Sequence, residues 1–244
     1  MKRVELFGIE GLPEVRPGDD LAQLIAGHAQ LETGDVLVVA QKIVSKAEGR
    51  LIDLSQVTPS EEAQRIAPRL IAAPDPRMVQ VVLGESVRVL RSERVLITET
   101  HHGYVSANSG VDHSNVGEGL LSLLPVDPDA SAEKIRSGLR EKTGAEVAVI
   151  VSDTFGRPWR LGIVNVALGV AGLPALIDLR GTLDDAGQPL HATVVAVADE
   201  VAASAGLVMG KTERTPVVVV RGLKLSGHGS GRDLIRPADE DLFR

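Results

Sequence analysis

The sequence predicts an α+β (mixed α/β) fold in which a mixed, partly antiparallel sheet is flanked by helices. Short valine-rich runs, such as residues 36–40 and 217–220, are typical of buried strands. Amphipathic segments that begin at capping residues lie between these runs, and this alternation indicates stacked layers of sheet and helix. The 244 residues predict a single domain over residues 1–244, with room for two subdomains whose boundary the sequence leaves open.

Each element is predicted from its own local pattern. Strands are expected at residues 4–7, 36–40, 87–90, 95–98, 147–151, 175–179, 193–197 and 217–220. Helices are expected after Asp19 or Asp20, from Thr58-Pro59-Ser60-Glu61, after Asp75-Pro76, from Ser131 to Gly144, and over 162–172 and 198–206. The stretch 162–172 is apolar with spaced glycines, which favours a closely packed helix.

Composition narrows the class of protein. The chain has no cysteine, which excludes disulfides, thiolate metal sites and a cysteine nucleophile. No apolar run approaches the ~18–20 residues of a membrane span, and the N-terminus lacks the apolar core of a signal peptide, so we expect a cytoplasmic protein that binds no membrane. A net charge of −7 with 2% aromatic residues gives no sign of a nucleic-acid surface, although a local basic cluster can still attract an anionic small molecule.

A first polar cluster, QKIVSKAEGR, follows the strand expected at residues 36–40. It is predicted as a loop that carries three cations, Lys42, Lys46 and Arg50. Cations placed after the end of a strand can hold phosphate groups. An ordinary solvated turn accounts for the same residues, and the pattern alone leaves both interpretations open.

A second cluster is the polar segment THHGYVSANSGVDHSN, residues 100–115, whose length without regular structure is typical of a functional loop. Its three histidines raise the question of zinc, but their spacing matches no standard zinc pattern; they are His101, His102 and His113. Asp112 together with Asn108 or Asn115 better suits a hard cation such as Mg²⁺ or Mn²⁺, which prefers oxygen ligands.

A third cluster, SDTFGRPWR, follows the strand expected at residues 147–151. Asp153 and Thr154 stand where that strand is predicted to give way to a loop, a common position for ligand sites. They suit a Mg²⁺ ion, and Arg157 and Arg160 suit a phosphate or carboxylate. An Asp cap on a turn, with the arginines paired to nearby acids, explains the residues equally well, and Trp159 has no assigned role.

Residues 205–212, AGLVMGKT, resemble a relaxed phosphate-binding loop with Ala in place of the first Gly. A true P-loop follows a strand and opens a helix, so that its backbone N–H groups point at phosphate. Here a predicted helix precedes the segment and a strand follows it. The order therefore argues against a P-loop NTPase fold, while Lys211 stays a candidate nucleotide contact in another geometry.

Five motifs in this order together resemble the coenzyme F420-0:γ-glutamyl ligase family: GLPEVRPGDDL, QKIVSKAEGR, SANSGVDHSN, SDTFGRPWR and ADEVAASAGLVMGKTERTPVVVVRG. The likeness runs from about Val4 through DLIRPADEDLF at the end of the chain. In mycobacterial relatives this domain is fused to a nitroreductase-like, flavin-binding domain. The likeness here covers only the ligase part of those relatives, so we expect a stand-alone γ-glutamyl ligase domain.

The resemblance implies a GTP-dependent ligase that joins L-glutamate to the carboxylate of coenzyme F420-0 and extends a γ-linked polyglutamate tail. It also implies two Mg²⁺ or Mn²⁺ ions, K⁺ as a helper, and a homodimer. It places metal on Asp112, Asp153 and Thr154. It places GTP against Leu12, Pro13, Glu14, Val15, Gln41, Lys46, Asn115, Met209, Gly210 and Lys211.

Two positions depart from what the family leads us to expect. Gln41 stands where some relatives are expected to carry Ser, and Lys211 stands where archaeal relatives are expected to carry an amide or an acid. A lysine cannot serve as a metal ligand in the way that an acid or an amide oxygen does. The ligands of the second ion are therefore left open.

Amide formation from a carboxylate needs activation, because the oxyanion is a poor leaving group. Transfer of the γ-phosphoryl group of GTP would give an acyl phosphate, which the glutamate amine then attacks. Divalent ions and basic side chains must offset the repulsion between the two anions. Arg157 and Arg160 are our hypothetical anchors for the acidic substrate tail or the transferring phosphate.

Two other functions compete with the ligase. One is a GTP-binding regulatory or sensor module without turnover, which the presence of Asp112, Asp153 and Thr154 argues against. The other is a metal-dependent phosphohydrolase with Asp153 as the nucleophile. That chemistry is expected to place a second Asp two residues further on, and this position is Phe155.

Overall fold

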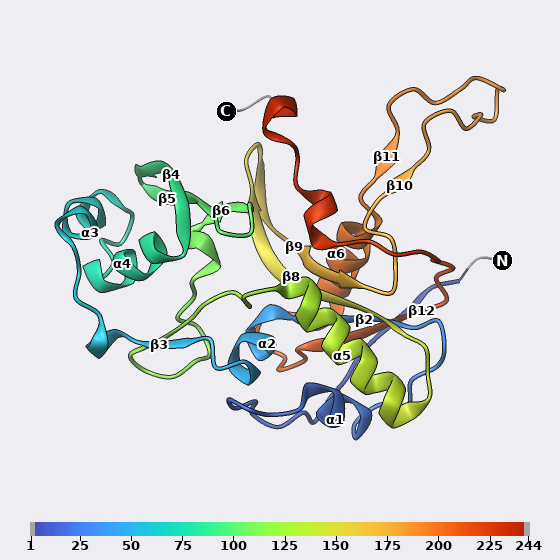
Figure 1. Ribbon diagram of the computed structural model, residues 1–244, viewed down its shortest axis with the longest axis horizontal. Coiled ribbons are helices and arrows are strands. Elements are labelled where there is room, and N and C mark those ends of the chain that lie inside the picture. Colours follow the sequence, from blue (N-terminus) through green and yellow to red (C-terminus); the bar gives the residue numbers. More distant parts are fainter. Residues whose placement is uncertain (1–2, 242–244) are drawn as a thin grey trace.

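The computed structural model describes residues 3–241 and is built around a five-stranded mixed sheet (Figure 1). The strands lie in the order β1-β12-β2-β8-β9, and within this sheet only β2 and β8 run parallel. The predicted α+β class with a mixed sheet is confirmed. The bounds of the strands are β1 Glu5–Gly8, β12 Val217–Arg221, β2 Val36–Ala40, β8 Ala148–Arg157 and β9 Arg160–Ala171.

Helices cover both faces of this sheet. In β2, Leu37 and Val39 point to the face that α1 (Leu21–Ala26) and α5 (Pro128–Thr143) cover. Val36 and Val38 point to the opposite face, which α6 (Val197–Met209) covers. Because both faces are buried, the strands read as continuous apolar runs rather than as an alternation of apolar and polar residues.

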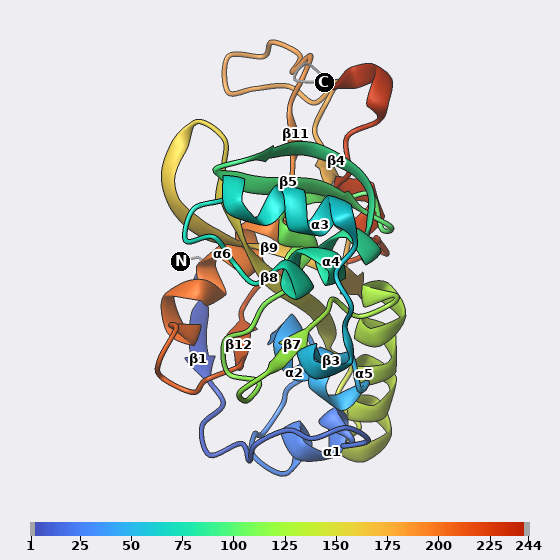
Figure 2. The same cartoon turned by 90° about the vertical axis from the view of Figure 1, so that its left-hand side faces the viewer.

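A smaller lobe is inserted between α2 (Gln41–Ala47) and α5, and lies at the left of Figure 1. It has its own apolar core, in which Leu96 and Leu121 are almost completely buried. Figure 2 views the molecule from this side. The lobe contains β3 (Leu51–Asp53) paired with β7 (Leu120–Ser122), helices α3 (Glu61–Ile66) and α4 (Pro76–Gly84), and the antiparallel sheet β4 (Ser86–Glu93), β5 (Val95–Thr100) and β6 (Val105–Ala107).

The remaining elements are short. The hairpin β10 (Ile177–Asp178) and β11 (Val194–Val195) begins an arm that extends away from the sheet at the right of Figure 1. The 3₁₀ helices are Leu54–Gln56, Ala67–Arg69, Asn108–Gly110, Gly231–Leu234 and Ala238–Glu240. No helix among residues 3–241 is long and apolar enough to cross a bilayer. The end of the DLIRPADEDLF motif lies outside the described residues.

The predicted helix starts are confirmed with small shifts. Asp20 and Asp75 each accept a hydrogen bond from a backbone N–H two or three residues further on, as expected of a cap. The N-terminal cap of α3 is Ser60 rather than Thr58, which precedes Pro59. Helix α5 begins before the predicted Ser131, because Asp127 caps it and the proline that follows is compatible with the first turn.

Three predicted elements are wrong in type. Residues 41–47 form helix α2 directly after β2 rather than a loop. Residues 152–157 continue strand β8, and residues 162–171 form β9 rather than a packed helix. The physical reason is pairing: β8 and β9 form one long antiparallel hairpin, and residues 163–170 include four β-branched residues, which favour a strand. The glycine spacing, which favoured a helix, reflects close contacts of the strand with its neighbours.

Gly169→Ala is expected to lower the free energy of unfolding by about 1–3 kcal/mol. A Cβ atom at this position of β9 would lie 2.0 Å from the carbonyl oxygen of Pro128, so the start of α5 would have to move. Gly84→Ala is the matched control, because no atom lies within 4 Å of the added Cβ. Urea unfolding of both variants measures the difference. Equal stability of Gly169→Ala and the wild type would show that α5 and β9 can separate without loss.

Candidate functional site

A cleft of about 1090 Å³ opens between the central sheet and the inserted lobe. Its floor is formed where β2 ends and its parallel pairing with β8 stops. The last pair of this register is Ala40 with Ser152, so that Gln41 and Asp153, one residue further along the chain in each case, lie at the same edge. The carboxyl ends of parallel strands are the usual place for a site in such sheets. The segment 108–115 of the lobe and the segment 209–216 after α6 form its walls.

The cleft brings together residues from five separate segments of the chain. Every residue that the family resemblance assigned to nucleotide or metal lines it, namely Leu12, Pro13, Glu14, Val15, Gln41, Lys46, Asp112, Asn115, Asp153, Thr154, Met209, Gly210 and Lys211. Arg157 and Arg160 do not line it. They face each other at the end of the β8–β9 hairpin, where Arg157 donates a hydrogen bond to the carbonyl oxygen of Leu161.

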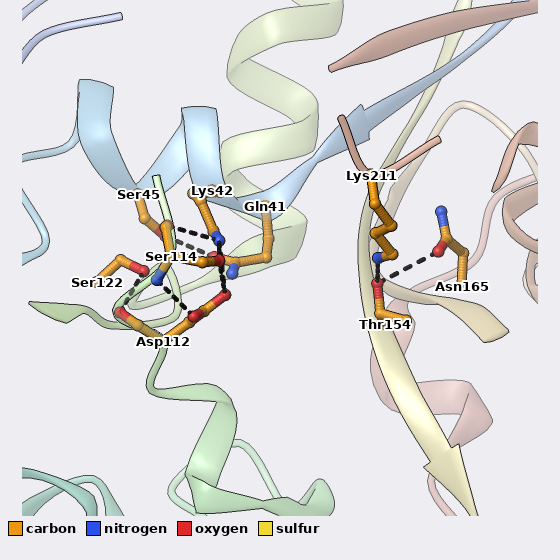
Figure 3. A network of polar contacts seen from close by, with 9 residues as sticks. All are labelled: Gln41, Lys42, Ser45, Asp112, Ser114, Ser122, Thr154, Asn165 and Lys211. Carbon is orange, nitrogen blue, oxygen red and sulfur yellow. Dashed lines mark hydrogen bonds and ion pairs between the residues drawn. The ribbon is translucent and has the colours of Figure 1, made fainter. Parts of the chain in front are cut away.

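Asp112 is held by a compact polar network on the lobe side of the cleft (Figure 3). Lys42 Nζ lies 2.6 Å from Asp112 Oδ2 and also donates to Ser114. The backbone N–H of Ser114 donates to Asp112 Oδ1 at 2.7 Å. Burial works to raise the pKa of Asp112, but the hydrogen bonds from Lys42 and Ser114 outweigh it and hold the pKa below its usual value. Asp112 is therefore an anion, already paired with a cation.

Asp153 lies in a different environment. Burial is the main reason that its pKa is raised to about 6, and the negative charge of Asp112 raises it further. Hydrogen bonding to the Thr154 backbone and the charges of Lys42 and Lys211 work in the opposite direction. Two carboxylates thus share one edge of the cleft, and positive charge placed between them would relieve their repulsion.

Thr154 belongs to a second polar cluster, seen at the right of Figure 3. Lys211 donates a hydrogen bond to the Thr154 hydroxyl, and this hydroxyl donates to Asn165 Oδ1 at 3.4 Å. The Asn165 amide in turn contacts Met209 Sδ at 3.7 Å. The ammonium group of Lys211 thus already bonds the Thr154 hydroxyl, on which the second ion was expected.

The side of the cleft that was predicted to bind nucleotide is basic. Lys46 is nearly buried and forms an ion pair with Glu14, while Gln41 accepts a hydrogen bond from Ser45 at 2.8 Å. Arg214 also lines the cleft. Cations that converge on one cavity create a local positive potential on an acidic protein, which favours a polyanionic ligand.

The histidines do not form a zinc site. His101 and His102 bond to backbone carbonyl oxygens of Gly84 and Pro125, and only His113 lines the cleft. Within residues 3–241, no three His, Asp or Glu side chains gather in a way that could hold a metal. Among the described residues, the donors that the cleft offers to an ion are thus the carboxylates of Asp112 and Asp153, together with neutral oxygen atoms.

Three cleft residues escaped the sequence analysis. Ser152 is buried, and its hydroxyl has no hydrogen-bond partner among the described residues. Asn165 was hidden in the stretch predicted as a helix, and its signal was the β-branched residues on both sides of it, which favour a strand. Arg214 carried no signal, because an arginine in a loop is usually solvated.

Comparison with known proteins identifies the family of the chain. The F420-0:Gamma-glutamyl ligase family model matches residues 10–222. The chain is 49% identical to the coenzyme F420:L-glutamate ligase of Methanothermobacter thermautotrophicus, over 99% of both chains. It is 46% identical to the protein of the same name from Methanocaldococcus jannaschii, over 100% of this chain and 98% of the relative, and 47% identical to that of Archaeoglobus fulgidus, over 99% and 97%. The chain therefore belongs to the F420-0:gamma-glutamyl ligase family.

Proposed function

We propose that this protein joins L-glutamate to coenzyme F420-0 in a GTP-dependent reaction, and that it adds further glutamates through γ-linkages. The relatives named coenzyme F420:L-glutamate ligase support the glutamate transfer. One observation supports the use of a triphosphate. Asp112 and Asp153, which are far apart in the sequence, meet in a single cleft lined by lysines from separate segments.

The proposed reaction has two steps. The acceptor carboxylate attacks the γ-phosphorus of GTP, the bond to the β-phosphate oxygen breaks, and GDP leaves. The amine of glutamate then attacks the acyl phosphate, phosphate leaves with the bonding electrons, and the amine loses a proton. Because anions react with anions, the main task of the protein is to offset charge and to fix positions. Lys42, Lys46 and Lys211 are the cations that the cleft provides for this.

The oxygen donors of the cleft fit one Mg²⁺ or Mn²⁺ ion. Mg²⁺ in nucleotide sites is usually held by one or two carboxylates, with phosphate oxygens and water in the other positions. Asp112 and Asp153 would supply the carboxylates, and the bound ion would neutralise charge on the triphosphate. A second ion on Thr154 fits less well, because Lys211 already bonds its hydroxyl. We therefore propose that the lysine takes over part of the charge compensation there.

Mass spectrometry tests the function directly. The protein is incubated with coenzyme F420-0, GTP, glutamate and Mn²⁺, and the expected product is a ladder spaced by one glutamyl unit, with GDP formed in proportion. Nucleotide binding without any product would favour the sensor module instead. Phosphate release that needs neither glutamate nor the acceptor would favour a phosphohydrolase. The absence of a mass increase with any nucleotide contradicts the ligase.

Lys46→Ala is expected to raise the KM for GTP about tenfold or more, because a nearly buried charged donor would be lost from the proposed phosphate site. Its ion-pair partner Glu14 is largely exposed and remains solvated, so we expect the fold to be retained. Lys134→Ala, an exposed lysine on α5, is the matched control and should leave this KM unchanged. Initial rates at saturating glutamate and acceptor measure the effect. An unaltered KM in Lys46→Ala would remove this residue from the nucleotide site.

A further inference from the structure

Arg214 differs from the other cations of the cleft in its contacts. The three lysines are each engaged by another residue, namely Lys42 by Asp112, Lys46 by Glu14 and Lys211 by Thr154. Arg214 lines the same cleft, but within residues 3–241 its guanidinium takes part in no hydrogen bond or ion pair. Its planar set of N–H donors is therefore available to a ligand.

The backbone of Arg214 is also unusual. Its φ of +57° lies in the left-handed region, which glycine adopts readily and a residue with a long side chain does not. The neighbouring residues hold it there. The Glu213 carboxylate accepts hydrogen bonds from the backbone N–H groups of the two preceding residues, each at 2.8 Å. Thr215 is 9% exposed and packs so closely on Gly8 of β1 that a Cβ atom there would lie 2.2 Å from its methyl carbon.

An arginine at such a position indicates a task for its side chain. Disfavoured backbone conformations that the surrounding structure imposes are common at ligand-binding sites. A glycine would suit the backbone better, but it would bring no charge into the cleft. The anchored loop thus presents a guanidinium to the cleft at a fixed point of its wall.

The proposed reaction leaves one substrate without a cation. Lys42, Lys46 and Lys211, together with the divalent ion, offset the charges of the triphosphate and of the acceptor carboxylate. L-Glutamate adds two more carboxylates, and it has no compensating charge of its own when its amine is neutral and ready to attack. A guanidinium can hold a carboxylate through two parallel N–H···O bonds, which a lysine cannot do.

We infer that Arg214 binds a carboxylate of the incoming L-glutamate and so holds its amine in the cleft. Arg214 and Lys211 belong to the same wall, so a carboxylate bound there stays in the cavity where the acyl phosphate is proposed to form. This inference rests on the proposed function, because it takes L-glutamate to be the amine donor. Arg214 would be a binding residue that selects the amino acid.

Arg214→Gly is expected to raise the KM for glutamate about tenfold or more and to leave the KM values for GTP and the acceptor within about twofold of the wild type. Glycine suits a φ of +57°, so we expect the variant to fold. Arg214→Lys keeps the charge but loses the fork of donors, so its KM should lie between the two. A raised KM for GTP with an unchanged KM for glutamate would assign the guanidinium to phosphate and overturn the inference.

Arg94→Gly is the matched control. Arg94 is also an exposed arginine with a left-handed backbone, at a φ of +64°, but it lies between β4 and β5 of the lobe, outside the cleft. All three KM values should stay at the wild-type level. A similar rise of the glutamate KM in both variants would attribute the effect to the backbone and contradict the inference.

Two amides of glutamate test whether the effect passes through a carboxylate. L-Glutamine lacks the γ-carboxylate, L-isoglutamine lacks the α-carboxylate, and both keep the amine. If the guanidinium holds the γ-carboxylate, Arg214→Gly lowers kcat/KM for glutamate but not for glutamine, because that contact is already absent. If it holds the α-carboxylate, isoglutamine is the insensitive substrate. An equal loss with glutamate and both amides overturns the inference.

Binding without turnover separates this inference from the proposed function. Isotopically labelled L-glutamate is dialysed against the wild type and Arg214→Gly in the presence of GDP, Mg²⁺ and coenzyme F420-0. We expect the wild type to retain glutamate and the variant to bind it about tenfold or more weakly. Retention that depends on Arg214, without product in the full reaction, keeps the inference and refutes the ligase. A product ladder with equal glutamate affinity and KM in both proteins keeps the ligase and overturns the inference. A wild type that neither retains glutamate nor forms product refutes both.

Discussion

Asp153→Asn is expected to lower kcat/KM for ligation by about 100-fold or more, while the folded protein becomes no less stable. The amide keeps the size of the side chain but loses the negative charge that would hold the divalent ion. Asp153 is one of the two carboxylates proposed to hold the ion, so the variant halves the carboxylate charge available to it. Initial-rate kinetics with all three substrates measures the loss.

The stability of the same variant depends on pH in a defined direction. Burial raises the pKa of Asp153 to about 6, above its ordinary value of 3.8, so its ionisation opposes folding. Below pH 4 the group is protonated in both the folded and the unfolded state, and the free energy of unfolding carries no cost of burying a charge. That stability is lost as the pH rises through 6, because the buried carboxylate must then ionise. In metal-free buffer at pH 7–8, Asp153→Asn should therefore raise the free energy of unfolding by up to about 3 kcal/mol, and this gain should disappear near pH 4.

Asp199→Asn is the matched control for the kinetic measurement. Asp199 is also partly buried with a raised pKa, and it accepts a hydrogen bond from the Ala167 backbone at 2.8 Å, but it lies outside the cleft. We expect its substitution to leave kcat/KM within about twofold of the wild type. An Asp153→Asn enzyme with full activity would show that the carboxylate binds no essential ion.

Arg221→Ala is expected to lower the free energy of unfolding by about 3 kcal/mol, because it leaves a buried carboxylate without its cationic partner, with only the Glu32 backbone N–H still donating to it. Asp35 is 1% exposed, and Arg221 Nε and Nη2 each lie 2.7 Å from one of its two oxygens. The guanidinium also packs over the Phe7 ring, 5.1 Å from its centre, and contacts Glu32. Urea unfolding at pH 7 measures the loss.

Two further variants identify the cause of that loss. Asp35→Asn combined with Arg221→Ala removes the stranded charge, so the double variant should be more stable than the sum of the two single changes predicts. Arg180→Ala breaks an ion pair with Asp178 of similar geometry but on an exposed arm, and no measurable change is expected. If both arginine variants lose the same stability, burial of the carboxylate is not the reason.

Much of the fold could be predicted from the sequence because its core strands are buried on both faces. The valine runs of β2 and β12 are typical of strands that are buried on both faces. Asp20 and Asp75 mark the starts of helices because each caps the first turn through a local hydrogen bond. The hairpin of β8 and β9 could not be predicted. Gly169 allows β9 to approach the start of α5 closely, and this contact is non-local, whereas the glycine spacing alone suggested a helix.

The site could be predicted only in part. The residues alone left Asp153 undecided between a cap and a metal ligand, since the choice depends on whether Asp112 lies beside it. That proximity is set by the register of β2 and β8 and by the position of the lobe, which local patterns do not encode. Arg157 and Arg160 were expected near the substrate because the chain was predicted to turn after Thr154. The strand instead continues and carries both arginines to the end of the hairpin.

The order of the central sheet has a consequence for how the chain folds during synthesis. Strand β1 pairs only with β12, which is the last strand of the sheet to be made. The inserted lobe has local pairings and its own core, so it can fold as soon as it leaves the ribosome. The first strand, in contrast, stays without a partner until almost the whole chain has emerged. Closure of β12 between β1 and β2 then completes the sheet in one step, and the wall formed by residues 209–216 reaches the cleft only at that moment.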